Sequence, residues 1–351
     1  MTKLVRINFL ILTFTTLAVN SFAAFGGGAA FLKKGVGARA LGMGGAYTSL
    51  VDDVSAIYWN PAGFAQIKKY NMSVMGASGA SDEWTGLKDV IPSHTFAAIS
   101  IPASKITDIL GESIFAIGLI NSTINNTVKS EEIDGGNDGI ETGKFSDTQN
   151  TVYLSWAMPI FENINNLYVG LSFKYISEKM SSISGGNALG YDMDAGILYI
   201  FLKTLNFGWV FNKGAALTWD GGHTDNAPLT IKFAISNKFN IVEKLNIIGA
   251  VDFVQVQKEP LLANIGTEIS YSDILTSSSF GLKALHLRGG INSYALENRY
   301  NVKDDINRNL TYSLGFGIDL IIFGSELRVD YALSMGNIFD QKNKISLSLF
   351  F

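Results

Sequence analysis

The sequence predicts an all-β fold, a transmembrane antiparallel β-barrel, from its composition and from the distribution of its apolar residues. Its 351 residues are 47% hydrophobic and 12% aromatic but only 17% charged, against roughly 25% charged residues in a typical soluble domain. Beyond the first two dozen residues, no uninterrupted apolar run approaches the about 18 residues that a membrane helix needs. Alternating strands closed into a barrel are the other way to cross a bilayer.

The N-terminus predicts a secretory signal peptide over residues 1–23. Lys3 and Arg6 precede an apolar stretch, and Ser21 and Ala23 are the small residues of a cleavage site. The rival interpretation, a membrane anchor, requires a longer apolar span. Cleavage would leave 27 − 2 = 25 basic against 31 acidic residues and no Cys. A nucleic-acid partner would need a clustered basic face, so we expect none, and the absence of Cys suits export through an oxidising space.

The strand period is clearest at the C-terminus. From Leu310 to Leu320 every even position is large and apolar, and every odd position is small or polar. The alternation returns from Leu327 to Met335 and again from Ile345 to Phe351. A final strand that ends on Phe351 resembles the assembly signal that outer-membrane barrels present to the barrel assembly machinery.

The same period predicts about fourteen strands within residues 68–351, an even number as bacterial barrels require. The remaining candidates are 70–79, 94–102, 112–122, 152–158, 167–175, 191–199, 205–211, 229–235, 245–253, 265–271 and 282–291. The expected connections alternate in length, which is typical of a membrane barrel. Those at 80–93, 123–146, 212–227 and 293–308 are long and polar, and those at 159–164, 202–203 and 322–324 are tight.

Charged residues at the polar positions of these strands are expected to face the lumen. They carry both signs: Lys174, Asp192, Asp194, Lys232, Asp252, Glu268, Arg288, Asp319, Glu326, Arg328 and Asp330. Such charges either pair with one another in a closed lumen or line a wet channel, and both alternatives stay open.

Residues 24–67 do not alternate and form a separate, glycine-rich segment. Gly42, Gly44 and Gly45 permit close backbone packing, and Asp52 or Asp53 is placed to cap a short helix that runs towards Trp59. The run Asn60-Pro61-Ala62-Gly63 predicts a turn that ends this helix.

The runs GARALGMGGAY (37–47) and DDVSAIYWNPAGFA (52–65) resemble the signature of the PorV/PorQ family of outer-membrane proteins. This family is related to the FadL-type transporters of hydrophobic compounds, which also carry an acidic pair followed by an NPAG-like turn. The resemblance implies a fourteen-stranded barrel in the outer membrane whose 24–67 segment folds into the lumen as a hatch. The hatch motif is then Gly42, Gly44, Gly45, Asp52, Asp53, Asn60, Pro61 and Gly63.

The sequence gives little support for a phosphate, calcium or other metal site in the individual motifs. The glycines at 42–45 lack the spacing of a phosphate loop, and the loop 134–139 departs from the EF-hand pattern, which leaves only loose calcium binding. Asp220, His223 and Asp225 are metal ligands by type, but a lone His in such a loop is usually solvated. We therefore expect neither a cofactor nor a metal, and a non-enzymatic protein.

Two functions follow from the resemblance. The first is a type IX secretion-associated component that docks exported proteins bearing C-terminal signal domains, with secretion-system components as partners. The alternative is a FadL-like transporter of hydrophobic small molecules, such as long-chain fatty acids, across the outer membrane. A purely structural barrel would do neither. Outer-membrane lipid is an expected partner in each case.

Overall fold

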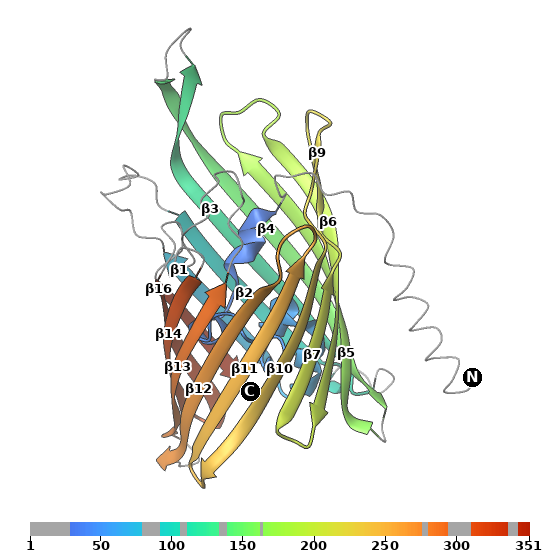
Figure 1. Cartoon of the computed structure of the whole chain (residues 1–351), viewed down its shortest axis with the longest axis vertical. Helices are drawn as coiled ribbons and strands as arrows, with labels where there is room; N and C mark the ends of the chain where they lie inside the picture. The colour runs from blue at the N-terminus through green and yellow to red at the C-terminus, as the bar shows by residue number, and fades with distance from the viewer. Residues whose placement is uncertain are drawn as a thin grey trace, which may run out of the picture.

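The computed structural model describes residues 29–78, 92–105, 111–132, 139–161, 164–275, 280–293, 310–335 and 343–351. Within these residues, fourteen antiparallel strands form a closed barrel, which confirms the predicted fold class (Figure 1). Closure occurs where β1 pairs with β16 and where β5 pairs with β6. The signal peptide expected at 1–23 lies outside the described residues.

The barrel strands are neighbours in the order of the chain, apart from an inserted hairpin between β7 and β10. Their bounds are β1 Asn71–Ser78, β2 Pro92–Pro102, β3 Ile114–Glu132, β4 Gly139–Phe161, β5 Ile164–Met180, β6 Asn187–Phe201, β7 Leu205–Asn212, β10 Thr230–Val242, β11 Leu245–Val256, β12 Leu262–Leu275, β13 Phe280–Ser293, β14 Leu310–Ile322, β15 Ser325–Met335 and β16 Asn343–Phe350. A short 3₁₀ turn, η4 (Ala103–Lys105), follows β2.

The alternation in the sequence corresponds to two different environments across the wall. In β14, Tyr312, Leu314 and Phe316 are exposed on the outside, while Thr311 and Ser313 are buried on the inside. Exposed apolar side chains surround the barrel in the same way, for example Leu154, Ile269 and Leu347. This apolar outer surface is what a lipid bilayer requires of a barrel.

Two regions expected as polar loops contain strand. β3 and β4 continue to pair out to Glu132 and Gly139, so most of 123–146 is a hairpin that rises above the rest of the barrel (Figure 1). Residues 212–227 contain the hairpin of β8 (Ala216–Trp219) and β9 (Thr224–Asn226), which pairs with β6. Residues 123–132 have no apolar alternation, and β8 and β9 are only four and three residues long, so the period on which the prediction depended is missing there.

The tight connections all lie at the end of the barrel that contains Phe351. They include 202–204, 243–244 and 323–324. We call this the short-turn end. The opposite end has the longer connections, among them 79–91 and 294–309, which lie outside the described residues.

Residues 29–67 lie inside the barrel, and we call them the lumen segment (Figure 1). The segment contains η1 (Ala30–Lys34), α2 (Ala38–Gly42), α3 (Ala56–Trp59) and η2 (Pro61–Gln66), joined by buried turns. None of the helices in the described part of the chain is long and apolar enough to cross a membrane.

Candidate functional site: the interface between the lumen segment and the barrel wall

The lumen segment follows the inner wall around the barrel. Its hydrogen bonds reach the strands in nearly the order in which the strands stand in the wall. They are Lys34 Nζ to Ser122 Oγ (2.7 Å, β3), His94 Nε2 to the Gly35 carbonyl (3.0 Å, β2), Gly37 N to Met75 Sδ (3.0 Å, β1), Ala38 N to Ser346 Oγ (3.1 Å, β16), Asn292 Nδ2 to the Gly44 carbonyl (3.2 Å, β13), Thr48 N to Asp252 Oδ2 (3.0 Å, β11), Asn206 Nδ2 to the Ser49 carbonyl (3.1 Å, β7) and Asn60 Nδ2 to the Ile197 carbonyl (3.1 Å, β6).

The remaining strands also contact the segment. Helix α2 packs on β14 and β15, and η2 packs on β4 and β5. Ser236 of β10 donates to the Ser49 carbonyl at 3.5 Å, and Gly266 of β12 lies against Met43. The described lumen segment therefore contacts every strand of the barrel wall.

Glycines in the wall allow this close approach. A Cβ added to Gly290 would lie 2.2 Å from the carbonyl carbon of Met43, and one added to Gly170 would lie 2.3 Å from that of Pro61. The same holds at Gly196, Gly208 and Gly266, where the added atom would lie under 3.0 Å from the segment.

The glycines of the segment have matching roles. Gly42 lies against Gly315, with 3.0 Å between the position of its missing Cβ and the Gly315 Cα. Gly44 and Gly45 adopt positive φ values of 64° and 76°, in the left-handed region that glycine tolerates best. Gly63 has no room for a side chain, because a Cβ there would lie 2.2 Å from Val51 Cγ1.

Asn60 joins the turn at 60–63 to the wall. Its side chain accepts from Ala62 N at 3.1 Å, which caps η2, and donates to the carbonyls of Thr48 (3.0 Å) and Ile197 (3.1 Å). Pro61 follows as the first residue of η2, where a missing N–H is harmless. This buried amide thus uses both its donor and its acceptor groups.

Asp52 and Asp53 have different roles. Ser55, and neither acid, is the residue that precedes α3, although Asp53 accepts from Ser55 N at 2.8 Å and so orders the turn before the helix. Burial, together with the charge of Asp52, raises the pKa of Asp53. Asp52 is half exposed and accepts from Arg39 Nη1 at 2.6 Å.

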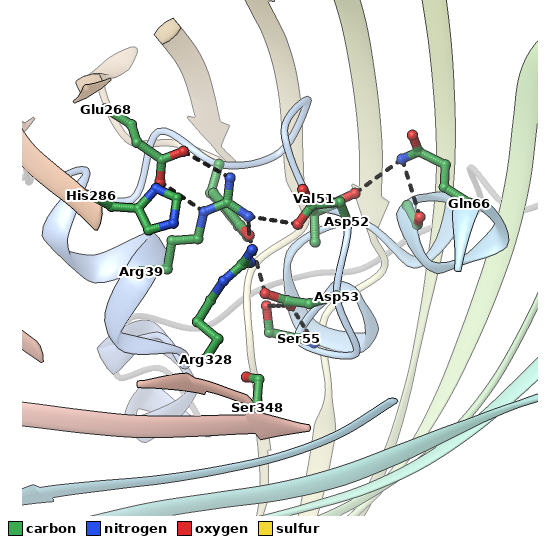
Figure 2. Close-up of polar contacts among 12 residues, drawn as sticks. Arg39, Val51, Asp52, Asp53, Ser55, Gln66, Glu268, His286, Arg328 and Ser348 are labelled. Carbon is green, nitrogen blue, oxygen red and sulfur yellow. Dashed lines mark hydrogen bonds and ion pairs between the residues drawn. The ribbon is translucent and has the colours of Figure 1, made fainter. Parts of the chain in front are cut away.

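Arg39 links the segment to a buried ionic network in the wall, and Figure 2 shows it between Glu268 and Asp52. Its Nε and Nη2 atoms lie 2.9 and 3.0 Å from the two carboxylate oxygens of Glu268 on β12. Glu268 also accepts from Arg288 Nε at 2.6 Å, and Arg288 Nη1 donates to Asp330 at 2.7 Å. Such bidentate, desolvated pairs are the strong form of ionic hydrogen bond.

A second part of this network lies closer to the short-turn end. Arg328 donates to both oxygens of Asp319 at 2.7 and 3.0 Å, and its Nη2 atom lies 3.9 Å from Glu326. His286 Nε2 lies 3.1 Å from Asp319, and His286 Nδ1 lies 2.8 Å from Ser270 Oγ. In serine hydrolases the serine contacts Nε2 and the acid contacts Nδ1. This arrangement is the reverse, with the acid already held by an arginine, so it does not support an enzyme.

Lys174 forms the centre of another buried cluster, on the opposite wall. Its Nζ lies 2.8 Å from Asp192 and 2.7 Å from Asp194. Lys232 lies over the rings of Tyr58 (5.7 Å) and Trp59 (5.3 Å) in the lumen segment, a cation–π contact. Most of the expected lumen charges therefore pair with one another or hold the segment.

Sequence reasoning missed Arg39 as the central residue of the interface. The only available signal was an arginine within a run of small residues ahead of an acidic pair. Phe351 lies at the end of β16, where it exchanges backbone hydrogen bonds with Tyr70 and stacks on its ring at 5.5 Å. Its role as an assembly signal stays a prediction.

Among the described residues, no group of three or more His, Cys, Asp or Glu side chains could hold a metal ion. In the β8–β9 hairpin, His223 Nε2 lies 2.9 Å from Asp225, while Asp220 accepts from Asn187. The loop considered for calcium, 134–139, lies almost entirely outside the described residues.

Comparisons with known proteins identify the fold. No protein-family model and no curated protein matches the sequence. Solved structures do match: the Pseudomonas putida toluene transporter TodX has 12% sequence identity and a TM-score of 0.54, and the match covers 90% of this chain and 97% of that one. The Ralstonia pickettii toluene transporter TbuX has 12% identity and a TM-score of 0.53, with 90% and 97% covered. A Pseudomonas aeruginosa FadL homologue has 10% identity and a TM-score of 0.52, with 90% and 98% covered. Over nine-tenths of its length, this chain has the barrel fold of these proteins.

Proposed function

We propose that this protein is an outer-membrane channel for hydrophobic small molecules and that the lumen segment is its hatch. The observation that carries the proposal is a barrel similar in fold to two toluene transporters and a FadL homologue, with a segment inside it that contacts every strand of the wall. A channel filled in this way needs the segment to move, or to leave a path along the wall, before a solute can pass.

The comparisons favour this function over docking of exported proteins in type IX secretion. None of the matched structures above is named as a secretion component. Membership of the PorV/PorQ family and the secretion role remain predictions from the sequence resemblance, as do the signal peptide and the barrel assembly machinery as a partner.

Uptake by intact cells tests the proposal. Cells whose outer membrane contains this barrel should take up radiolabelled toluene or oleate faster than cells that contain a barrel of another family in its place. Equal rates would contradict a channel for these solutes. Co-purification of secreted proteins bearing C-terminal signal domains, without uptake, would favour secretion instead.

Because the chain contains no Cys, an engineered disulfide can test whether the segment must move. A Cβ added to Gly42 of the segment would lie 3.7 Å from the Ala332 Cβ of β15, within the about 3.5–4.5 Å that a disulfide requires, so oxidation of G42C/A332C should block uptake and reduction should restore it. The control is S73C/S348C, which joins β1 to β16 within the wall, where the two hydroxyls lie 2.9 Å apart. Uptake through the oxidised G42C/A332C protein would show that the segment does not need to move.

A further inference from the structure

Two tight turns at the short-turn end place large apolar residues where the backbone disfavours them. Phe323 and Gly324 have φ values of 49° and 80°, and Leu202 and Lys203 have φ values of 52° and 63°. Two successive positive φ values are typical of a type I′ turn, which favours Asn-Gly. Bulky side chains are unusual there, yet Phe323 is 90% exposed and Leu202 is 71% exposed.

The same feature recurs along one continuous arc of the barrel. The connections β6–β7, β10–β11, β12–β13 and β14–β15 join eight strands that are adjacent in the wall. Each has exposed apolar residues at or beside its described end, and we call this set the apolar turn arc: Leu202, Ile241, Val242, Leu275, Phe280 and Phe323.

The arc is continuous with the apolar outer surface of the strands. Phe201, Phe239 and Tyr271 are exposed just before these turns, so the apolar surface extends to the turns themselves. On the remaining arc, the exposed side chains described at the same end are mostly charged, namely Lys68, Lys69, Lys105 and Glu112, and Phe351 is exposed beside them. The apolar turn arc also has exposed charges, Lys203, Glu243 and Lys244, but its large apolar side chains outnumber them.

We propose that the apolar turn arc is immersed in the interfacial layer of the lipid bilayer, while the opposite arc at the same end stays in water. The occupant of this surface is lipid, because the arc continues the surface that lipid covers in the proposed outer-membrane protein. In water the exposed side chains and the backbone of Phe323 and Leu202 are both unfavourable; in lipid the side chains become favourable. The barrel would then lie tilted in the bilayer, deeper on the β6–β15 side.

The inference rests on the proposed membrane location. Spin labelling tests the immersion of the apolar turn arc and the membrane location of the barrel separately. Nitroxide labels would be attached to L202C and F323C, and to E112C on the opposite arc, in the full chain in phosphatidylethanolamine and phosphatidylglycerol vesicles. Leu347→Cys on the outer surface and His223→Cys on the β8–β9 hairpin provide the lipid and water references. Collision rates with oxygen and with a water-soluble nickel chelate report the depth of each label.

We expect labels at 202 and 323 to favour oxygen, as at 347, and the label at 112 to favour the nickel chelate, as at 223. If 202 and 323 match 112, the arc is in water and the inference is wrong, although the barrel still spans the membrane. If the label at 347 also favours the nickel chelate, the membrane location itself fails, and the proposed function fails with it.

The sign of a stability change provides a second test. Phe323→Asn creates the Asn-Gly pair that a type I′ turn prefers, so in water it should raise the urea concentration at the midpoint of unfolding. Immersion in lipid predicts a lower midpoint in vesicles, because the lost apolar contact outweighs the gain in the turn. Lys203→Asn is the control: it places Asn at another position of positive φ, 63°, without removing an apolar side chain, and it should not lower the midpoint. A higher midpoint for Phe323→Asn would overturn the inference.

Discussion

Arg39 of the lumen segment and Glu268 of β12, 229 positions apart in the sequence, form two hydrogen bonds of 2.9 and 3.0 Å inside the barrel. Both side chains are almost fully buried, and Arg288 shares the same carboxylate. The pair therefore joins the segment to the wall through charges that have lost their water. Removing one buried partner leaves the others uncompensated.

Glu268→Gln should weaken this attachment strongly, because it leaves Arg39 and Arg288 without their shared anion. We expect a loss of about 3–5 kcal/mol in the free energy of unfolding, measured by urea titration of the barrel in vesicles. The control is Glu326→Gln, whose partner Lys283 is partly exposed, and which should cost only about 0–1 kcal/mol. Equal losses would show that the Glu268 site is not the stronger attachment.

Gly290→Ala should displace the lumen segment, because the new Cβ would lie 2.2 Å from the carbonyl carbon of Met43. Trypsin should then cleave at the buried Arg39 faster than in the unaltered protein, as followed by mass spectrometry. The adjacent Gly289 has no neighbouring atom within 4 Å of its missing Cβ, so Gly289→Ala should leave the cleavage rate unchanged. The same rate in both variants would argue against tight packing of the segment on β13.

Asn60→Asp should loosen the turn that joins the segment to β6. The carboxylate can still accept from Ala62 N, but it cannot donate to the carbonyls of Thr48 and Ile197. Two buried carbonyls would lose a donor, and we expect a loss of about 1–3 kcal/mol in the free energy of unfolding. Asn240 is exposed, and Asn240→Asp should change stability by less than about 0.5 kcal/mol. A neutral Asn60→Asp would show that the two carbonyls find other donors.

Lys174→Met should destabilise the barrel, because it leaves Asp192 and Asp194 buried without a cation. Adding D192N and D194N removes both charges and should restore much of the lost stability. Stability is measured as the temperature at which the protein changes from the gel migration of the folded barrel to that of the unfolded chain. Lys179 on the same strand is exposed, so Lys179→Met should have almost no effect. Failure of the triple variant to recover would mean that Lys174 acts through packing rather than charge.

Prediction from sequence succeeded where both faces of a strand have constant surroundings. In β14 and β16, an exposed apolar outer face and a buried inner face of small or polar residues give a period of two that is visible in the residues themselves. It failed at residues 123–132 and 139–146 of β3 and β4, where the sequence lacks this period, and at β8 and β9, which are only four and three residues long. The interface was only partly predictable. Gly42 and Asn60 belong to a recognisable motif. Gly170 and Gly290 have no local signal, because the need for glycine there comes from contact with the lumen segment, more than a hundred positions away in the chain.

The sequence by itself therefore determined the barrel, the facing of most strands and the separate character of residues 24–67, because composition and period report local surroundings. Only the tertiary structure decided that the lumen segment contacts all of the wall, that Arg39 pairs with Glu268, and that Arg328 pairs with Asp319. These pairings depend on strand register and on the path of the segment around the lumen. Both result from closing the barrel, which brings together residues whose spacing in the chain does not indicate that they meet.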